Sequence, residues 1–284
     1  MRIANLRDRL VLVRQDRAID VEQASAGCFG ADPQAVYARW AEFRAWAAEA
    51  EERGGLPEGS AFTAADLGAP APAPRQVLAI GLNYRDHASE SGFGAPEGLP
   101  PVFTKFVTSI SGPETEVVLP EGGHTDWEVE LVAVVGTEAH RVSADAAWEH
   151  VAGLAVGQDI SERVSQLAGP VPQFSLGKSF PGFAPIGPWL VTPDEFDNPD
   201  DLELRCTING EEVQKGRTRD LIFSVPALIA GLSAVLPLLP GDVIFTGTPA
   251  GVGLGRDPQR WLAPGDDLVS TIEGIGELRQ RFTA

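Results

Sequence analysis

Cysteine and basic residues are both scarce in this sequence of 284 residues. The two cysteines, Cys28 and Cys206, lie far apart and belong to no CxxC or Cys/His cluster, which argues against a disulfide framework and against structural zinc. Only 22 Lys and Arg stand against 40 Asp and Glu, so the formal net charge is −18. Because nucleic acids and anionic membranes attract positive surfaces, we expect neither as a partner.

The chain also lacks a long apolar run near its start. Charges interrupt the first ten residues, MRIANLRDRL, every few positions, so the pattern of a signal peptide or a membrane span is missing. We therefore expect a cytoplasmic protein, in keeping with its few cysteines. The hydrophobic content of 43% is sufficient for a substantial core.

The first 70 residues read as a small α+β unit. Leu10 to Val13 resemble a strand, and Asp32 followed by Pro33 predicts the start of a helix that ends at Gly54. That helix places four apolar residues at helical spacing: Val36, Trp40, Phe43 and Ala47. Residues 68–75, GAPAPAPR, read as a stiff linker. We therefore predict a small domain over residues 1–70 and a catalytic domain over residues 71–284.

The remainder is a series of short β-branched runs separated by Gly and Pro. We expect strands at Gln76 to Leu82, Val102 to Phe106, Glu128 to Val135, Leu202 to Ile208, Val243 to Thr246 and Leu268 to Glu273. Two segments read as helices: one capped by Ser143 that carries Trp148 and Val151, and one capped by Ser224 that carries Leu228, Leu232 and Val235. So few helices favour a β-rich α+β fold over regular βαβ winding.

The motif DWEVELVAVV, residues 126–135, predicts a strand on which Glu128 and Glu130 share one face. The same face continues as Val132 and Val134, where unpaired charges would be costly and a divalent cation would offset that cost. The alternative is an exposed strand end with two solvated glutamates. Asp159 follows another apolar run, and three carboxylates without Cys or His neighbours suit Mg²⁺, Mn²⁺ or Ca²⁺. Alone, Asp159 equally fits a loop or cap.

His87 and Glu90, in GLNYRDHASE, share a face if their segment is helical, so they could form a base with its orienting carboxylate. A surface His/Glu pair is the alternative. Lys105 and Lys178 each lie among apolar neighbours, which suggests either substrate anchors or side chains that extend to solvent. In PGDVIFTGTPAGVG, the loop amides and Thr248 could hold a carboxylate or phosphate, and a plain tight connection is the alternative.

Taken in order, the segments GLNYRDHASE, PPVFTKF, DWEVELVAVVG, GQDISER, LGKSF, PIGPWLV, NGEEVQ and PGDVIFTGTPAGVG resemble the fumarylacetoacetate hydrolase family over residues 77–280. The resemblance implies a mixed β-roll, a homodimer, and one Mg²⁺ or Mn²⁺ per subunit. It also implies a role for each matching residue: metal ligands Glu128, Glu130 and Asp159; an acid–base pair His87 and Glu90; a substrate-contacting Lys178; and binding residues Lys105, Arg163, Gln166 and Thr248.

The family likeness leads us to expect a metal-dependent hydrolase that cleaves a carbon–carbon bond in a β-diketo acid, such as an acylpyruvate, fumarylpyruvate or a 2,4-diketo-3-deoxy sugar acid. Decarboxylation of oxaloacetate and isomerisation of 2-hydroxyhepta-2,4-diene-1,7-dioate are alternatives on the same site. A non-catalytic ligand-binding protein is a further alternative, because a fold alone does not establish activity. We expect the distal group of the substrate to meet residues 91–100 and the N-terminal unit.

Overall fold

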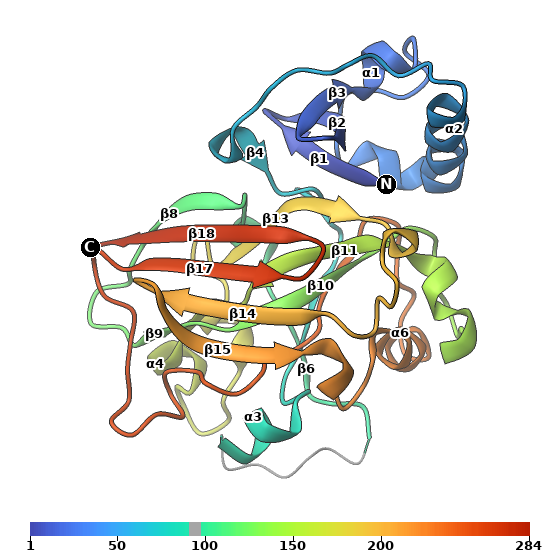
Figure 1. Cartoon of the computed structure of the whole chain (residues 1–284). Coiled ribbons are helices and arrows are strands. Elements are labelled where there is room, and N and C mark those ends of the chain that lie inside the picture. Colours follow the sequence, from blue (N-terminus) through green and yellow to red (C-terminus); the bar gives the residue numbers. More distant parts are fainter. Residues whose placement is uncertain (91–97) are drawn as a thin grey trace.

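Most of the strands belong to one large sheet, in a computed structural model that describes residues 1–90 and 98–284 and the side chains of 1–87 and 98–284 (Figure 1). Nine strands follow one another in this sheet: β3 (Arg17–Asp20), β2 (Arg9–Arg14), β1 (Arg2–Leu6), β13 (Ala184–Val191), β11 (Val151–Gln158), β10 (Val129–Val135), β16 (Val243–Phe245), β5 (Val77–Ile80) and β6 (Val102–Thr104). Two short strands join its side, β4 (Leu67–Gly68) on β1 and β7 (Ile110–Ser111) on β13.

A second sheet of five strands packs across β10 and β11 (Figure 1). Its order is β15 (Glu211–Arg217), β14 (Glu203–Ile208), β17 (Asp267–Ile272), β18 (Gly276–Thr283) and β8 (Glu114–Val118). A separate ladder joins β9 (Thr125–Asp126) to β12 (Ser161–Glu162). This strand-rich, mixed α/β architecture confirms the predicted fold class.

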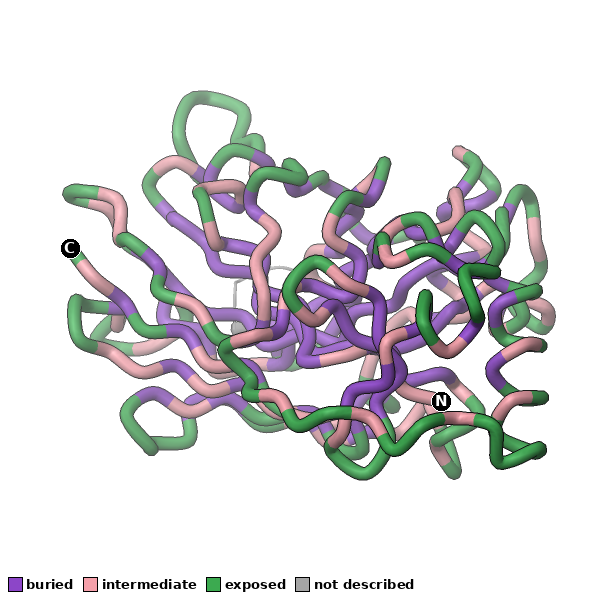
Figure 2. The backbone as a smooth tube through the Cα atoms, turned by 90° about the horizontal axis from the view of Figure 1, so that it is seen from above, coloured by how far each residue is buried: buried purple, intermediate pink, exposed green. Residues whose placement is uncertain are grey.

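The core lies on both faces of β10, which explains why all seven of its residues are buried. Leu131 and Val135 pack in the cluster that includes Leu204 and Leu268 of the second sheet. The alternate residues of β10 pack in a different cluster, which includes Phe245 of β16. Figure 2 shows buried segments through the middle of the molecule and exposed ones around its periphery.

The six strands predicted after residue 75 are all present, and their ends differ from those expected by at most two residues. The α-helices are few and mostly short: α1 (Val21–Ala24), α2 (Trp40–Glu52), α3 (Arg85–Glu90), α4 (Arg163–Gln166), α5 (Phe174–Gly177) and α6 (Val225–Ser233). The Ser224 hydroxyl accepts a hydrogen bond from the Ala227 amide, as expected of the residue that caps α6.

Three helix predictions need correction. Val235, expected on the helix that Ser224 caps, lies beyond α6, which ends at Ser233. Asp32 does not begin an α-helix: its carboxylate accepts the Gln34 amide in a local turn, a 3₁₀ helix follows at Ala35–Arg39, and α2 begins only at Trp40. The segment after Ser143 is a 3₁₀ helix, Ala144–His150, and Val151 already belongs to β11, where it pairs with Val135. A β-branched residue at helical spacing fits the start of a buried strand equally well.

The N-terminal unit is joined to the rest of the chain by more than its linker. Strand β1 pairs antiparallel with β13, so the large sheet continues from residues 184–191 into β1, β2 and β3 (Figure 1). Ala69 and Ala71 of the proline-rich stretch are buried, and the Tyr37 hydroxyl donates to the Pro70 carbonyl at 2.9 Å. The division at residue 70 stays a prediction. Within the described residues, no helix is long and apolar enough to cross a membrane.

Candidate active site

Strand pairing brings three carboxylates together. Glu128 comes just before β10 and Asp159 just after β11, and the antiparallel register sets Val129 opposite Gln158. The Asp159 amide donates to the Glu128 carbonyl at 2.9 Å, which fixes the two residues side by side. Glu130 lies one residue into β10, on the same face as Glu128.

The three acids form a compact and buried cluster. One carboxylate oxygen from each of Glu128, Glu130 and Asp159 lies within 4.8 Å of the others. Their exposed fractions are 5%, 1% and 0%, which contradicts the alternative of a solvated strand end. A set of hard oxygen ligands at this spacing fits a divalent cation such as Mg²⁺ or Mn²⁺.

Two of the three acids are paired with buried cations. The Lys178 ammonium lies 2.7 Å from Glu128 Oε2 and 2.7 Å from Asp159 Oδ2, while Arg163 lies 2.7 Å from Glu128 Oε1. Burial alone would raise the pKa of Glu128, but Lys178 and Arg163 lower it to about 2. Burial likewise opposes the charge on Lys178, yet Asp159 and Glu128 leave its pKa above the usual value. Lys178 is therefore a charged group next to the acids.

Glu130 differs from Glu128 in the direction of its pKa shift. Its Oε2 accepts the Gly247 amide at 2.7 Å, and burial together with the charges of Asp159 and Glu128 raises its pKa well above the ordinary value. A divalent cation within this cluster would remove that penalty, because it offsets the repulsion between the acids. The residues present therefore fit a metal ion.

Lys105 lies beside Asp159 and is not among the residues that line the cavity described below. Its ammonium donates to Asp159 Oδ1 and to the Lys178 carbonyl, and it lies 5.8 Å from the centre of the Phe245 ring. Only 2% of the residue is exposed, so it does not extend to solvent. Burial lowers the pKa of Lys105, although Asp159 opposes this shift. These contacts favour a role for Lys105 in supporting the acidic cluster over a role as a substrate anchor.

Close packing of two short helices positions Lys178 and Arg163. Gly177 ends α5 so near α4 that a Cβ atom there would lie 2.6 Å from the Gln166 amide nitrogen. Arg163 begins α4, and its guanidinium donates to Gln166 Oε1 at 2.8 Å. The close packing of α4 and α5 places the Arg163 guanidinium and the Lys178 ammonium beside Glu128.

Asp126 is a site residue that the sequence reasoning missed. Its Oδ2 accepts from Arg163 at 2.9 and 2.7 Å, and its Oδ1 accepts the Gly253 amide at 2.6 Å. The residue is fully buried. Its place at the start of DWEVE, two residues before Glu128, was the available signal, and the carboxylate fixes the orientation of Arg163.

The glycine-rich loop binds the protein's own carboxylates. Gly247 and Gly253 donate their amides to Glu130 and Asp126. The Thr248 hydroxyl donates to the Val129 carbonyl at 2.9 Å and accepts from Gln214 at 2.8 Å. The loop thus holds the two acids in place, and the Thr248 hydroxyl is committed to protein groups.

A cavity of about 570 Å³ opens beside the acidic cluster. Its polar lining consists of His87, Glu128, Arg163, Gln166, Lys178 and Thr248. His87 lies on α3 and is 8% exposed. The backbone of Glu90 ends the same helix, but its side chain lies outside the described part of the chain, so the predicted His87–Glu90 pair stays a prediction.

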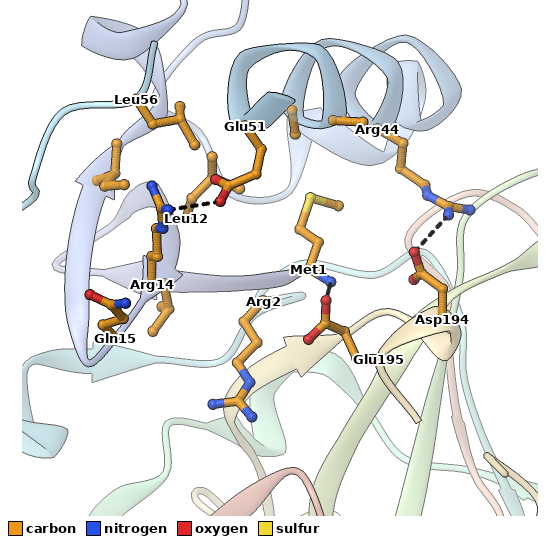
Figure 3. A pocket seen from close by; sticks show the side chains of 14 residues that line it. Met1, Arg2, Leu12, Arg14, Gln15, Arg44, Glu51, Leu56, Asp194 and Glu195 are labelled. Carbon is orange, nitrogen blue, oxygen red and sulfur yellow. Dashed lines mark hydrogen bonds and ion pairs between the residues drawn. The ribbon is translucent and has the colours of Figure 1, made fainter. Parts of the chain in front are cut away.

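The N-terminal unit does not take part in this cavity. Every residue that lines it lies between Ile80 and Leu254, so the expectation that the substrate would meet residues 1–70 is wrong for the described residues. The unit forms a different pocket of about 440 Å³ with the segment around Asp194 and Glu195 (Figure 3). There Arg14 pairs with Glu51 at 3.0 Å and Arg44 with Asp194 at 3.5 Å (Figure 3).

Curated relatives match most of the chain. A 2,4-didehydro-3-deoxy-L-rhamnonate hydrolase from Sphingomonas sp. (strain SKA58) is 45% identical over 218 residues, which is 76% of each chain. The mitochondrial oxaloacetate tautomerase FAHD2A of Homo sapiens is 44% identical over 209 residues, 73% of this chain and 66% of its own. These named relatives are enzymes with different reactions.

Solved structures match over the whole length. A Mycobacterium smegmatis protein provisionally named HpcE is 57% identical with a TM-score of 0.95, covering 100% of this chain and 99% of its own. Maleylpyruvate hydrolase from Sphingobium sp. SYK-6, in complex with manganese(II) and pyruvate, is 29% identical with a TM-score of 0.80 and covers the same shares. The model of the fumarylacetoacetate (FAA) hydrolase C-terminal domain matches residues 76–283, which contain the whole acidic cluster and its cavity, and the chain therefore belongs to the fumarylacetoacetate hydrolase family.

Proposed function

We propose that this protein hydrolyses a carbon–carbon bond in a β-diketo acid, with one Mg²⁺ or Mn²⁺ held by Glu128, Glu130 and Asp159. The observation that carries this proposal is the buried acidic cluster beside a cavity that His87, Arg163 and Lys178 also line. The hydrolase names of two relatives and the manganese ion in one of them support it.

The proposed role of each group in the site follows from its charge. When bound, the cation supplies a Lewis acid for the substrate's carboxylate and 2-oxo oxygens and for the enolate that leaves. Lys178, held charged between Glu128 and Asp159, neutralises negative charge that develops on the substrate. Arg163 keeps Glu128 ionised and orients the Glu128 carboxylate through its contact with Oε1.

Water activation belongs to His87. In its neutral form the imidazole takes a proton from water, and the hydroxide adds to the distal ketone. The carbon–carbon bond then breaks to give a carboxylic acid and the enolate of the 2-oxo acid, which takes the proton back from the imidazolium. Glu90, three residues further along α3, orients the ring. A Glu90→Gln variant that kept full hydrolytic turnover would contradict this part of the proposal.

The test uses metal-stripped protein with acetylpyruvate and with oxaloacetate, each with and without Mg²⁺ or Mn²⁺, and identifies products by mass. Cation-dependent release of acetate and pyruvate supports the hydrolase. Cation-dependent CO₂ and pyruvate from oxaloacetate alone, without cleavage of acetylpyruvate, contradicts it and indicates a decarboxylase.

The name of the human relative favours a second candidate, keto–enol tautomerisation of oxaloacetate. The same charged groups would stabilise an enolate without any attack by water. Tautomerisation conserves mass, so a change in the ultraviolet absorbance of oxaloacetate without new products separates it from hydrolysis and decarboxylation.

A further inference from the structure

We infer that the cavity accepts a 2-oxo acid whose distal group is uncharged and largely apolar, so that the substrate is an acylpyruvate with a single carboxylate. This inference rests on the proposed function and narrows its substrate class. It excludes diketo acids that end in a second carboxylate.

Much of the cavity lining is apolar. Its apolar side chains include Ile80, Leu82, Phe103, Leu167, Phe174 and Leu254. Phe103 and Phe174 meet edge to face with ring centres 5.6 Å apart, and the Lys178 ammonium lies 5.1 Å from the centre of the Phe103 ring. The apolar lining therefore begins directly beside Lys178, the charged group that faces the reacting end of the substrate.

The lysine and the arginine that line the cavity, Lys178 and Arg163, are already engaged with carboxylates. Lys178 bridges Glu128 and Asp159, and Arg163 contacts Asp126, Glu128 and Gln166. The substrate's own carboxylate and 2-oxo group face this charged end. Within the described lining, a second carboxylate would meet no further Lys or Arg.

A second carboxylate desolvated against apolar wall without a cationic partner loses binding free energy. An alkyl or aryl group gains binding free energy on the same surface.

The experiment compares two ligands that share the reacting end and carbon number: 2-oxohexanoate, which ends in a methyl group, and 2-oxoadipate, which ends in a carboxylate. Calorimetric titration of the Mn²⁺-loaded protein should give a dissociation constant for 2-oxohexanoate that is at least about tenfold lower. Equal affinity, or tighter binding of 2-oxoadipate, overturns the inference.

A pair of variants tests the apolar wall itself. Leu167 lines the cavity and is 47% exposed, so Leu167→Lys can place an ammonium at its mouth without burying it in the core. This variant should reduce the preference for 2-oxohexanoate by about tenfold. Leu176→Lys is the matched control, because Leu176 is 71% exposed and does not line this cavity. An equal change in both variants contradicts the inference.

Neither 2-oxohexanoate nor 2-oxoadipate has the second ketone at which a diketo acid is cleaved. Binding is therefore measured apart from turnover. If the predicted preference holds while acetylpyruvate is not hydrolysed, the substrate-binding inference stands and the proposed hydrolase fails. If acetylpyruvate is hydrolysed but 2-oxoadipate binds as tightly as 2-oxohexanoate, the hydrolase stands and the inference fails.

Discussion

The cavity beside the acidic cluster and the pocket of the N-terminal unit both contain acids and bases, but they differ in solvent exposure. Beside the cavity, the side chains of Lys178 and Asp159 are 2% and 0% exposed. The side chains of Arg14 and Glu51, which line the N-terminal pocket (Figure 3), are each 49% exposed. Buried charges interact strongly and shift each other's pKa, while exposed pairs are screened by water and salt.

This difference indicates where the chemistry lies. Charge buried at a high desolvation cost is retained where it performs a task, such as holding a cation or stabilising an enolate. The pocket in the N-terminal unit carries ion pairs of the ordinary surface kind, which contribute little to stability. Substitutions that remove a single charge from each region can therefore test the comparison.

The largest expected effect comes from Glu128→Ala. Loss of one ligand should abolish Mn²⁺ binding in calorimetry and lower turnover about a thousandfold or more. Glu51→Ala in the N-terminal pocket is the matched control and should change neither quantity. Unaltered turnover in Glu128→Ala would remove the basis for the metal assignment.

Lys178→Met should destabilise the metal-free protein by about 3 kcal/mol, because Glu128 and Asp159 each lose a buried cationic partner. Urea unfolding measures the loss, and Mn²⁺ should recover part of it because the ion neutralises the same carboxylates. Lys215→Met, which removes a lysine whose side chain is 49% exposed, should stay within about 0.5 kcal/mol of the wild type. Equal losses in the two variants would mean that burial does not distinguish these charges.

Glu162 directly precedes Arg163, which lines the cavity. The pH dependence of the contribution of Glu162 to stability tests the effect of burying a charged group. Its carboxylate accepts the His124 and Val164 amides at 2.9 Å and the Ser165 amide at 2.7 Å. Burial would raise the pKa of Glu162, but these hydrogen bonds lower it below the ordinary value. The carboxylate therefore stabilises the fold above the unfolded-state pKa, about 4.3, and this stabilisation is lost as pH falls through the lower folded-state pKa.

Glu162→Gln should accordingly cost about 1–2 kcal/mol at pH 7 and progressively less below pH about 4. Urea unfolding of both proteins between neutral and acid pH measures the difference. A cost that does not change with pH would assign the effect to packing instead of charge.

Local pattern was sufficient for the strand that carries the acids. The alternation in DWEVELVAVV predicts both β10 and the shared face of Glu128 and Glu130, and the structure confirms the strand. The position of Asp159 depends on the register between β10 and β11, a contact across 30 residues that no local pattern specifies. The family resemblance supplied what local physics could not.

Other features depend on packing that becomes visible only in three dimensions. The glycine-rich loop has amides suited to an anion, yet the anions it meets are Glu130 and Asp126. Lys105, just after β6, could have been a surface lysine, but it is buried against Asp159. Sequence spacing predicts which groups are available, whereas long-range contacts decide which of them pair.

The smallest expected effect comes from Arg14→Gln in the N-terminal pocket. The pair with Glu51 spans 3.0 Å between half-exposed side chains, so its loss should lower the free energy of unfolding by less than about 1 kcal/mol and leave turnover unchanged. Because exposed ion pairs are screened, about 1 M salt should remove even this difference from the wild type. Urea unfolding at low and high salt measures the effect. If Arg14→Gln instead lowered turnover, the N-terminal pocket would contribute to function despite its distance in sequence from the cavity residues, and the proposed contrast between the two regions would be wrong.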